Sequence, residues 1–138
     1  MKKTIKLVSL LTLLLTFVFV SCKKDEPEPE TNTEVAEKVN KVAVKSDGTN
    51  GKIYNGVFNS DTLQSFDFNV KVTKLADNKI KIEPQGEGTA FEVTMSLSAN
   101  SFLNGDVGQV VFTENPDGTL KLTYNYNSGE QFVGDEVN

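Results

Sequence analysis

Strict alternation of apolar and polar residues is the feature that most constrains the fold of this chain. It recurs in four stretches, FDFNVKV (66–72), KIKIE (79–83), FEVTMSL (91–97) and LKLTYNY (120–126). Successive side chains of an extended strand point to opposite faces, so each stretch has one apolar and one polar face. This is typical of antiparallel strands with one side on a core. The pattern predicts that Phe66 lies on the same buried face as Phe68 and Val70.

Turn signals separate these stretches. The segments LADNK (75–79) and ENPDGT (114–119) have the composition of hairpin connections, and QGEG (85–88) and NGD (104–106) indicate further turns. Weaker strands are predicted near 52–58, 107–113 and 130–134. Seven or eight short strands predict an all-β antiparallel meander, closed as a small barrel or, alternatively, folded as a β-sandwich.

The first 21 residues have the pattern of a signal peptide. Three lysines precede a largely apolar run over 7–20, which is shorter than the roughly 20 residues that span a bilayer. Ser21 and Cys22 then resemble a bacterial lipobox, in which the cysteine is lipidated and becomes the first residue of the mature protein. Cys22 is the only cysteine, so it has no disulfide partner within an exported chain. We therefore predict a lipoprotein signal peptide over 1–21 and an acyl anchor on Cys22.

A second signal follows the cysteine. Lys24, Asp25 and Glu26 resemble the export tag of surface lipoproteins in Bacteroidota. The resemblance implies a lipid-anchored protein of the outer membrane, exposed at the cell surface, with the periplasmic face as the alternative. Mature bacterial lipoproteins carry several acyl chains, and such an anchor holds a protein at the membrane effectively permanently.

Charged residues and proline dominate the segment after the anchor. We interpret residues 22–45 as an acylated tether and residues 46–138 as the barrel domain. Thr31 with Glu34 could cap a short helix that carries Val35, Val39 and Val42 on one stripe. Equally, the segment KVAVKS (41–46) could form a first strand. The pattern leaves both alternatives open.

The composition excludes several kinds of chemistry. The chain has no histidine, and with Cys22 acylated it lacks the usual general bases, thiol nucleophiles and transition-metal ligands. We expect no catalytic residues, no metal and no cofactor. Glu83, Glu87 and Glu92 flank one turn, and we interpret them as solvated carboxylates rather than as a catalytic pair.

The charge balance excludes nucleic acid as a partner. Removal of the signal peptide takes three lysines from the chain and lowers the formal net charge from −5 to −8. An acidic chain without arginine has no electrostatic footprint for a phosphate backbone. The predicted membrane contact is therefore the acyl anchor alone.

Two tyrosines are the candidate ligand contacts. Tyr124 and Tyr126 lie on the apolar face of their predicted strand, and a buried phenolic hydroxyl needs a hydrogen-bond partner. They either pack in the core or form, together with Tyr54, a pocket wall at one open end. An eight-stranded barrel is just wide enough to be filled by its own side chains or to hold one small ligand.

A family resemblance extends over residues 50–134. The segments YNGVF, NPDGTLKLTYNY and GEQFVG, with the tether and the alternating strands, resemble small calycin-like or lipocalin-like lipoproteins of Bacteroidota. The resemblance implies a calycin-like barrel at the membrane. Together with the missing catalytic chemistry, it leads us to predict a non-enzymatic, surface-anchored binding or interaction module. The alternative is a carrier of a small apolar ligand, and a third possibility is a subunit that contacts an exported protein partner.

Overall fold

The computed structural model describes residues 32–85 and 92–138 of the chain. The predicted signal peptide, Cys22, and the export residues Lys24, Asp25 and Glu26 lie outside the described residues. Glu87 lies outside them as well. No helix in the described part of the chain has the length and hydrophobicity needed to span a bilayer.

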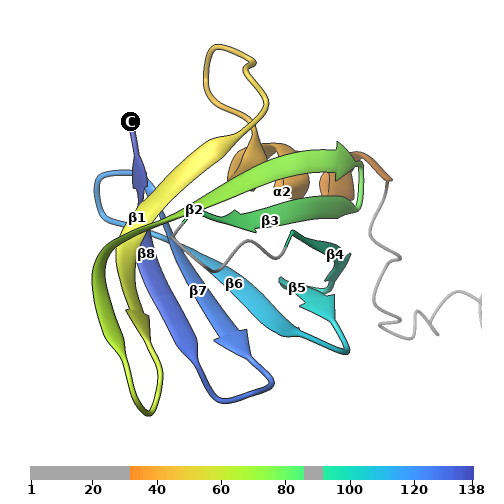
Figure 1. Cartoon of the computed structure of the whole chain (residues 1–138). Coiled ribbons are helices and arrows are strands. Elements are labelled where there is room, and N and C mark those ends of the chain that lie inside the picture. The colour runs from red at the N-terminus through yellow and green to blue at the C-terminus, as the bar shows by residue number, and fades with distance from the viewer. Residues whose placement is uncertain (1–31, 86–91) are drawn as a thin grey trace, which may run out of the picture.

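The described strands form a closed antiparallel barrel in which each strand pairs with the next and the last pairs with the first (Figure 1). The strands are β1 (Lys52–Asn59), β2 (Gln64–Ala76), β3 (Lys79–Pro84), β4 (Val93–Ser98), β5 (Ser101–Asn104), β6 (Gly108–Glu114), β7 (Leu120–Tyr126) and β8 (Gln131–Val137). The prediction of an all-β antiparallel meander closed as a small barrel is confirmed. The sandwich alternative is excluded because β1 and β8 pair with each other.

The alternating residues line the barrel interior as predicted. Val70, Val72, Ile80, Ile82 and Leu122 are fully buried. Their polar neighbours on the same strands are half-buried or exposed. The interior is therefore a core of aliphatic and aromatic side chains. Their burial stabilises the folded state by about 25 cal/mol for each Å² of apolar surface removed from water.

Phe66 departs from the predicted pattern. Its side chain is 66% exposed, whereas Phe68 is buried. Gly56 of β1 pairs with Phe68, but Phe58 pairs with Ser65, so β2 has one extra residue at this point. Asp67 adopts a positive φ of 58° there. One extra residue shifts the alternation of the strand, so Phe66 and Phe68 point to opposite faces of the sheet. The prediction that Phe66 is buried is therefore wrong.

Two glycines allow the barrel to close. Gly56 of β1 lies opposite Gly134 of β8. A Cβ atom on Gly56 would lie 2.0 Å from the carbonyl oxygen of Val133, and one on Gly134 would lie 2.4 Å from Cζ of Phe132. The missing side chains let the two strands approach closely, and the ring of Phe132 covers the space above Gly134.

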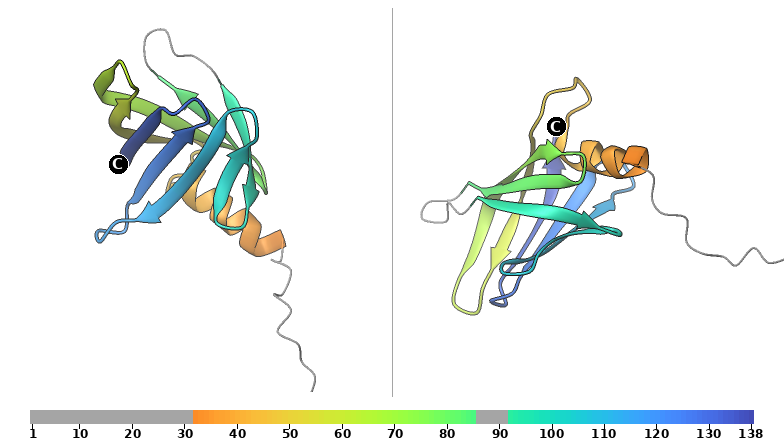
Figure 2. Two further views of the ribbon diagram at one scale, coloured as in Figure 1. Left: turned by 90° about the horizontal axis from the view of Figure 1, so that it is seen from below. Right: turned by 90° about the vertical axis from the view of Figure 1, so that its right-hand side faces the viewer.

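A helix covers one end of the barrel (Figure 2). It is α2 (Asn32–Ala43), with Glu34 in its first turn and Lys41 in its last. Val39 and Ala43 are fully buried against the barrel core. The Tyr54 hydroxyl donates a hydrogen bond of 2.8 Å to the carbonyl oxygen of Val42. Of the two alternatives for this segment, the helix is observed, and only Val44 forms an isolated bridge with Asn50.

Part of the predicted tether is thus structured. Residues 32–43 form α2 and pack on the barrel, and residues 22–31 lie outside the described residues. The strand β5 was not predicted. The turn before it is made by Ala99, with φ of 52°, and Asn100, and it contains neither glycine nor proline to indicate a turn.

Candidate functional site

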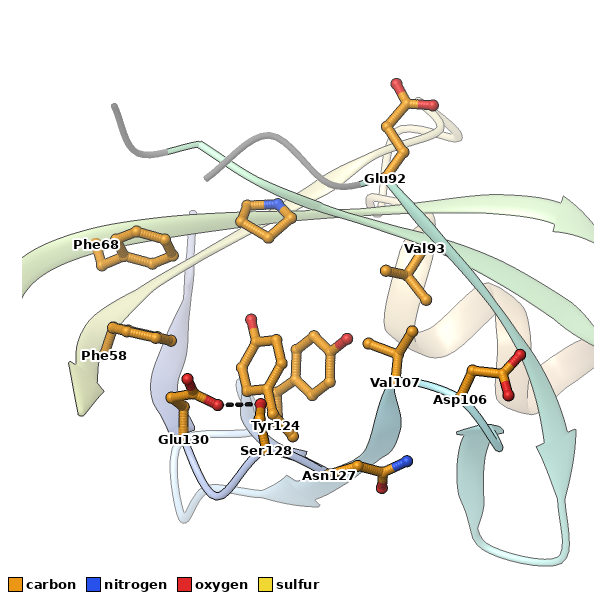
Figure 3. Close-up of a pocket in the computed structure, with 12 residues that line it drawn as sticks. Phe58, Phe68, Glu92, Val93, Asp106, Val107, Tyr124, Asn127, Ser128 and Glu130 are labelled. Atoms are coloured by element: carbon orange, nitrogen blue, oxygen red, sulfur yellow. Dashed lines mark hydrogen bonds between the residues drawn. The ribbon is translucent and has the colours of Figure 1, made fainter. Parts of the chain in front are cut away.

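The end of the barrel opposite α2 contains a cavity of about 580 Å³ (Figure 3). It lies where β1, β3, β5 and β7 end and where β2, β4, β6 and β8 begin. Its walls are formed by Phe58, Phe68, Pro84, Glu92, Val93, Asp106, Val107, Tyr124, Tyr126, Asn127, Ser128 and Glu130. The volume lies within the range of roughly 300–1,000 Å³ that is usual for sites of small ligands.

Four aromatic rings form one continuous wall of this cavity. The ring centroids of Phe58 and Phe68 are 5.5 Å apart, and Phe58 meets Tyr126 edge to face at 5.9 Å. Tyr126 is stacked on Tyr124 with a centroid distance of 3.8 Å and an interplanar angle of 17°. The wall offers ring faces and ring edges to an apolar ligand, since aromatic rings pack well against other rings in offset or edge-to-face contacts.

The hydroxyl of Tyr124 has no hydrogen-bond partner among the described residues. The residue is 0% exposed, and its ring lies among the side chains that surround the cavity (Figure 3). Burial raises the pKa of Tyr124 to about 12. The phenol is therefore neutral at physiological pH and can both donate and accept a hydrogen bond.

Tyr126 is also held in its neutral form. Burial raises the pKa of its phenol, and the charges of Tyr124 and Glu130 raise it further. The carboxyl group of Glu130 behaves in the opposite way. A hydrogen bond from the Ser128 hydroxyl holds the pKa of Glu130 below its ordinary value, so this carboxylate is ionised at neutral pH.

Tyr54 lies apart from the other two predicted contacts. It does not line the cavity, and its hydroxyl is bonded to α2 at the other end of the barrel. Its ring packs on Phe112 at a centroid distance of 5.5 Å. The structure therefore brings Tyr124 and Tyr126 together and gives Tyr54 a structural contact under the helix.

The carboxylates singled out from the sequence do not form a catalytic pair in the described residues. Glu83 is 3.1 Å from the ammonium of Lys81 and accepts a hydrogen bond from the hydroxyl of Thr73. Burial by itself would raise the pKa of Glu83, but the hydrogen bond from Lys81 and its charge lower it. Glu92 lies at the edge of the cavity and faces Lys81 at 3.4 Å.

Several residues of the site were not singled out from the sequence, notably Val107 and Glu130, and Asp106 was considered only as part of its turn. They belong to connections between strands that are distant in the sequence, and only the closed barrel brings them to one opening. The segment NGD (104–106) predicts the turn that carries Asp106, and its oxygens are too few for a calcium loop.

Comparison of the chain with protein-family models, with curated proteins and with solved structures finds no match. What the site can bind therefore follows from its own geometry. It is a cavity with an aromatic wall, one buried unpaired hydroxyl and an acidic edge.

Proposed function

We propose that this protein is a non-enzymatic binding module, anchored to a membrane, that takes up one small and largely apolar ligand at the open end of its barrel. The observation that carries the proposal is the Tyr124 hydroxyl, which is buried beside the cavity without a hydrogen-bond partner among the described residues. An unpaired buried polar group costs about 1–3 kcal/mol. The hydroxyl is closed to solvent, so a ligand atom reaches it by displacing a neighbouring side chain, and pairing with it then recovers that cost.

The shape of the cavity limits the class of ligand. About 580 Å³ accommodates a compound of one to three rings, and the stacked tyrosines with Phe58 and Phe68 favour a flat body. One hydrogen-bonding group on the ligand would match Tyr124. These features support a carrier or receptor of a small ring compound.

A fluorescence titration tests this proposal. N-phenyl-1-naphthylamine, a neutral dye that becomes bright in apolar surroundings, is titrated into the purified full chain. We expect saturable binding at one site. Val107→Trp, which places an indole in the cavity, should abolish binding, because Val107 lines the cavity and is only half-buried.

Thr113→Trp is the matched control. Thr113 is exposed on β6 and does not line the cavity, so this variant should bind the dye as the wild type does. The proposal is contradicted if the wild type shows no saturable binding, or if Val107→Trp binds the dye as tightly as Thr113→Trp does.

The membrane anchor is a separate part of the proposal. It is supported by the apolar run before Ser21 and Cys22 and by the absence of any other cysteine. Cys22→Ala should release the protein from membranes, and continued fractionation with membranes would refute lipidation.

Replacing Lys24, Asp25 and Glu26 with alanine should remove protease accessibility on intact cells while the protein stays lipidated. Unchanged accessibility would refute the export tag.

A further inference from the structure

We infer that the ligand of the open end is an organic cation, namely an ammonium group on a flat apolar body. This inference rests on the proposed function and adds the charge of the ligand to it. The observation behind it is the combination of carboxylates around the cavity with an aromatic wall and the unpaired Tyr124 hydroxyl inside it.

Three connections of the barrel each contribute one carboxylate to the edge of the cavity. Glu92 precedes β4, Asp106 lies between β5 and β6, and Glu130 lies between β7 and β8. In Figure 3 the Glu130 carboxyl group lies next to Ser128 and Tyr124, Asp106 lies beyond Val107, and the Glu92 carboxyl group points away from the rings. No lysine is among the described residues that line this cavity. Carboxylates without a neighbouring cation favour a positively charged ligand over an anion at this opening.

Two of these carboxylates lack a cationic partner in the described part of the chain. Glu92 faces Lys81 at 3.4 Å, but Asp106 and Glu130 form no ion pair with any described residue. Glu130 accepts its hydrogen bond from the neutral hydroxyl of Ser128. Glu130, beside the tyrosine rings, is thus the carboxylate placed to meet a cationic group of the ligand, and Asp106 adds a second negative charge at the outer edge of the opening.

Hydrogen bonds between the two connections hold these charges in place. Asn127, in the β7–β8 connection, donates from its side-chain amide to the carbonyl oxygen of Gly105 at 2.8 Å. Its backbone NH donates to the carbonyl oxygen of Val107, also at 2.8 Å. The connection that carries Glu130 is therefore hydrogen-bonded to the residues on both sides of Asp106. Because the two connections are already ordered, a cation that binds loses little affinity to their ordering.

The arrangement fits an organic cation better than a metal ion. In the described parts of the chain, no three acidic, histidine or cysteine side chains come close enough together to hold a metal. A substituted ammonium needs no such ligand set, and aromatic faces attract it within about 6 Å of a ring centroid. Tyr124, which is 0% exposed and unpaired, is an independent indication that the cavity receives a ligand.

The opposite end of the barrel shows that this acidic lining is not general. A smaller cavity of about 300 Å³ under α2 is lined by Lys38, Lys41 and Glu114 together with apolar residues. There Lys41 and Glu114 form an ion pair. Positive and negative side chains both line the cavity at the helix end, whereas the charged residues among the described residues that line the open end are all carboxylates.

Three probes with one naphthalene body and different charges test the inference. They are 1-naphthylmethylammonium, 1-naphthylmethanol and 1-naphthoate, titrated into the full chain by calorimetry at low salt. We expect the ammonium to bind about tenfold more tightly than the alcohol and the carboxylate to bind most weakly. Added salt should weaken binding of the ammonium and leave that of the alcohol unchanged, because exposed charges are screened.

Substitution of the carboxylates tests whether they cause the preference for the ammonium probe. Asp106→Asn with Glu130→Gln should weaken ammonium binding about fivefold and leave alcohol binding unchanged. Asp47→Asn removes one charge from the exposed loop between α2 and β1, outside the cavity, and should change neither. Equal affinity for ammonium and alcohol, or equal loss of both in the double variant, overturns the cation inference and leaves the proposed function standing. Absence of saturable binding by all three probes overturns both.

Discussion

At one end of the barrel α2 covers the core, and at the other end the rings of Tyr124 and Tyr126 face a cavity of about 580 Å³. Each end has a buried tyrosine. Tyr54 donates its hydroxyl proton to the carbonyl oxygen of Val42 in α2, whereas the hydroxyl of Tyr124 has no partner among the described residues. The tyrosine hydroxyl under the helix thus has a hydrogen-bond partner, whereas the tyrosine hydroxyl near the open end has none among the described residues.

The two ends of the barrel therefore differ in role: the residues at the helix end stabilise the fold, and those at the open end are available for binding. At the helix end, Val39, Ala43 and Tyr54 are all fully buried and make the contacts that their chemistry requires. At the open end, apolar surface and a polar atom are left without partners. Native proteins keep few such groups, and each one calls for a reason such as a bound ligand.

The largest expected effect comes from placing the same charge at the two ends. Val39→Asp should lower the free energy of unfolding by more than about 3 kcal/mol, because Val39 is fully buried under the barrel end and an unpaired carboxylate there is desolvated. Val107→Asp should cost at most about 1 kcal/mol, since Val107 borders the open cavity. Urea unfolding measures both. Equal losses would show that the two ends do not differ in solvent access.

The second effect depends on pH. Burial raises the pKa of Tyr124 to about 12 and also raises that of Tyr54. Since the ordinary value is about 10, the folded protein holds these protons more tightly than the unfolded chain does. The stabilisation is complete below pH 10 and is lost as the pH rises toward 12, by at most about 1.4 kcal/mol per pH unit for each tyrosine.

Urea unfolding midpoints at pH 9, 10 and 11 follow this loss. Lysines also titrate in this range, so the comparison is with Tyr124→Phe, whose midpoint should fall less steeply with pH. If the wild type and Tyr124→Phe show the same dependence on pH, the Tyr124 phenol is not shielded from water as the structure indicates.

The smallest effect concerns the bulge at the open end. Asp67 has a positive φ of 58° and no described ion pair. Asp67→Gly should raise the free energy of unfolding by up to about 1 kcal/mol, because glycine adopts this conformation without strain. Asp61→Gly, in the adjacent β1–β2 turn, is the control and should not stabilise. A loss of stability in Asp67→Gly would mean that the bulge conformation is not strained.

Much of the barrel could be predicted because its signal is local. The alternation around Ile80 and Ile82 is set by the two-residue period of a strand, and both are buried. Phe66 could not be predicted, because the extra residue at Asp67 is not visible in the alternation itself. The sequence could not distinguish a helix over 32–43 from a strand over 41–46. The helix is stabilised by the packing of Val39 and Ala43 on the end of the barrel, and this contact is not visible in the local sequence.

The site was predicted only in part, for a topological reason. Tyr124 and Tyr126 lie late in β7, at the open end, whereas Tyr54 lies early in β1. Both strands are antiparallel to β8 and therefore run in the same direction, so early and late positions fall at opposite ends. Asp106 and Glu130 meet at the cavity only because the connections between strands are gathered at one opening.

The most direct test of the account compares two single-atom deletions, Tyr54→Phe and Tyr124→Phe, by urea unfolding without ligand. Tyr54→Phe should lower the free energy of unfolding by about 1–2 kcal/mol, because the carbonyl group of Val42 loses its partner. Tyr124→Phe should raise it by about 1 kcal/mol, because an unpaired buried hydroxyl is removed. Opposite signs are the predicted result. A loss of stability in Tyr124→Phe comparable to that in Tyr54→Phe would show that the Tyr124 hydroxyl is already paired, and would contradict a ligand site at the open end.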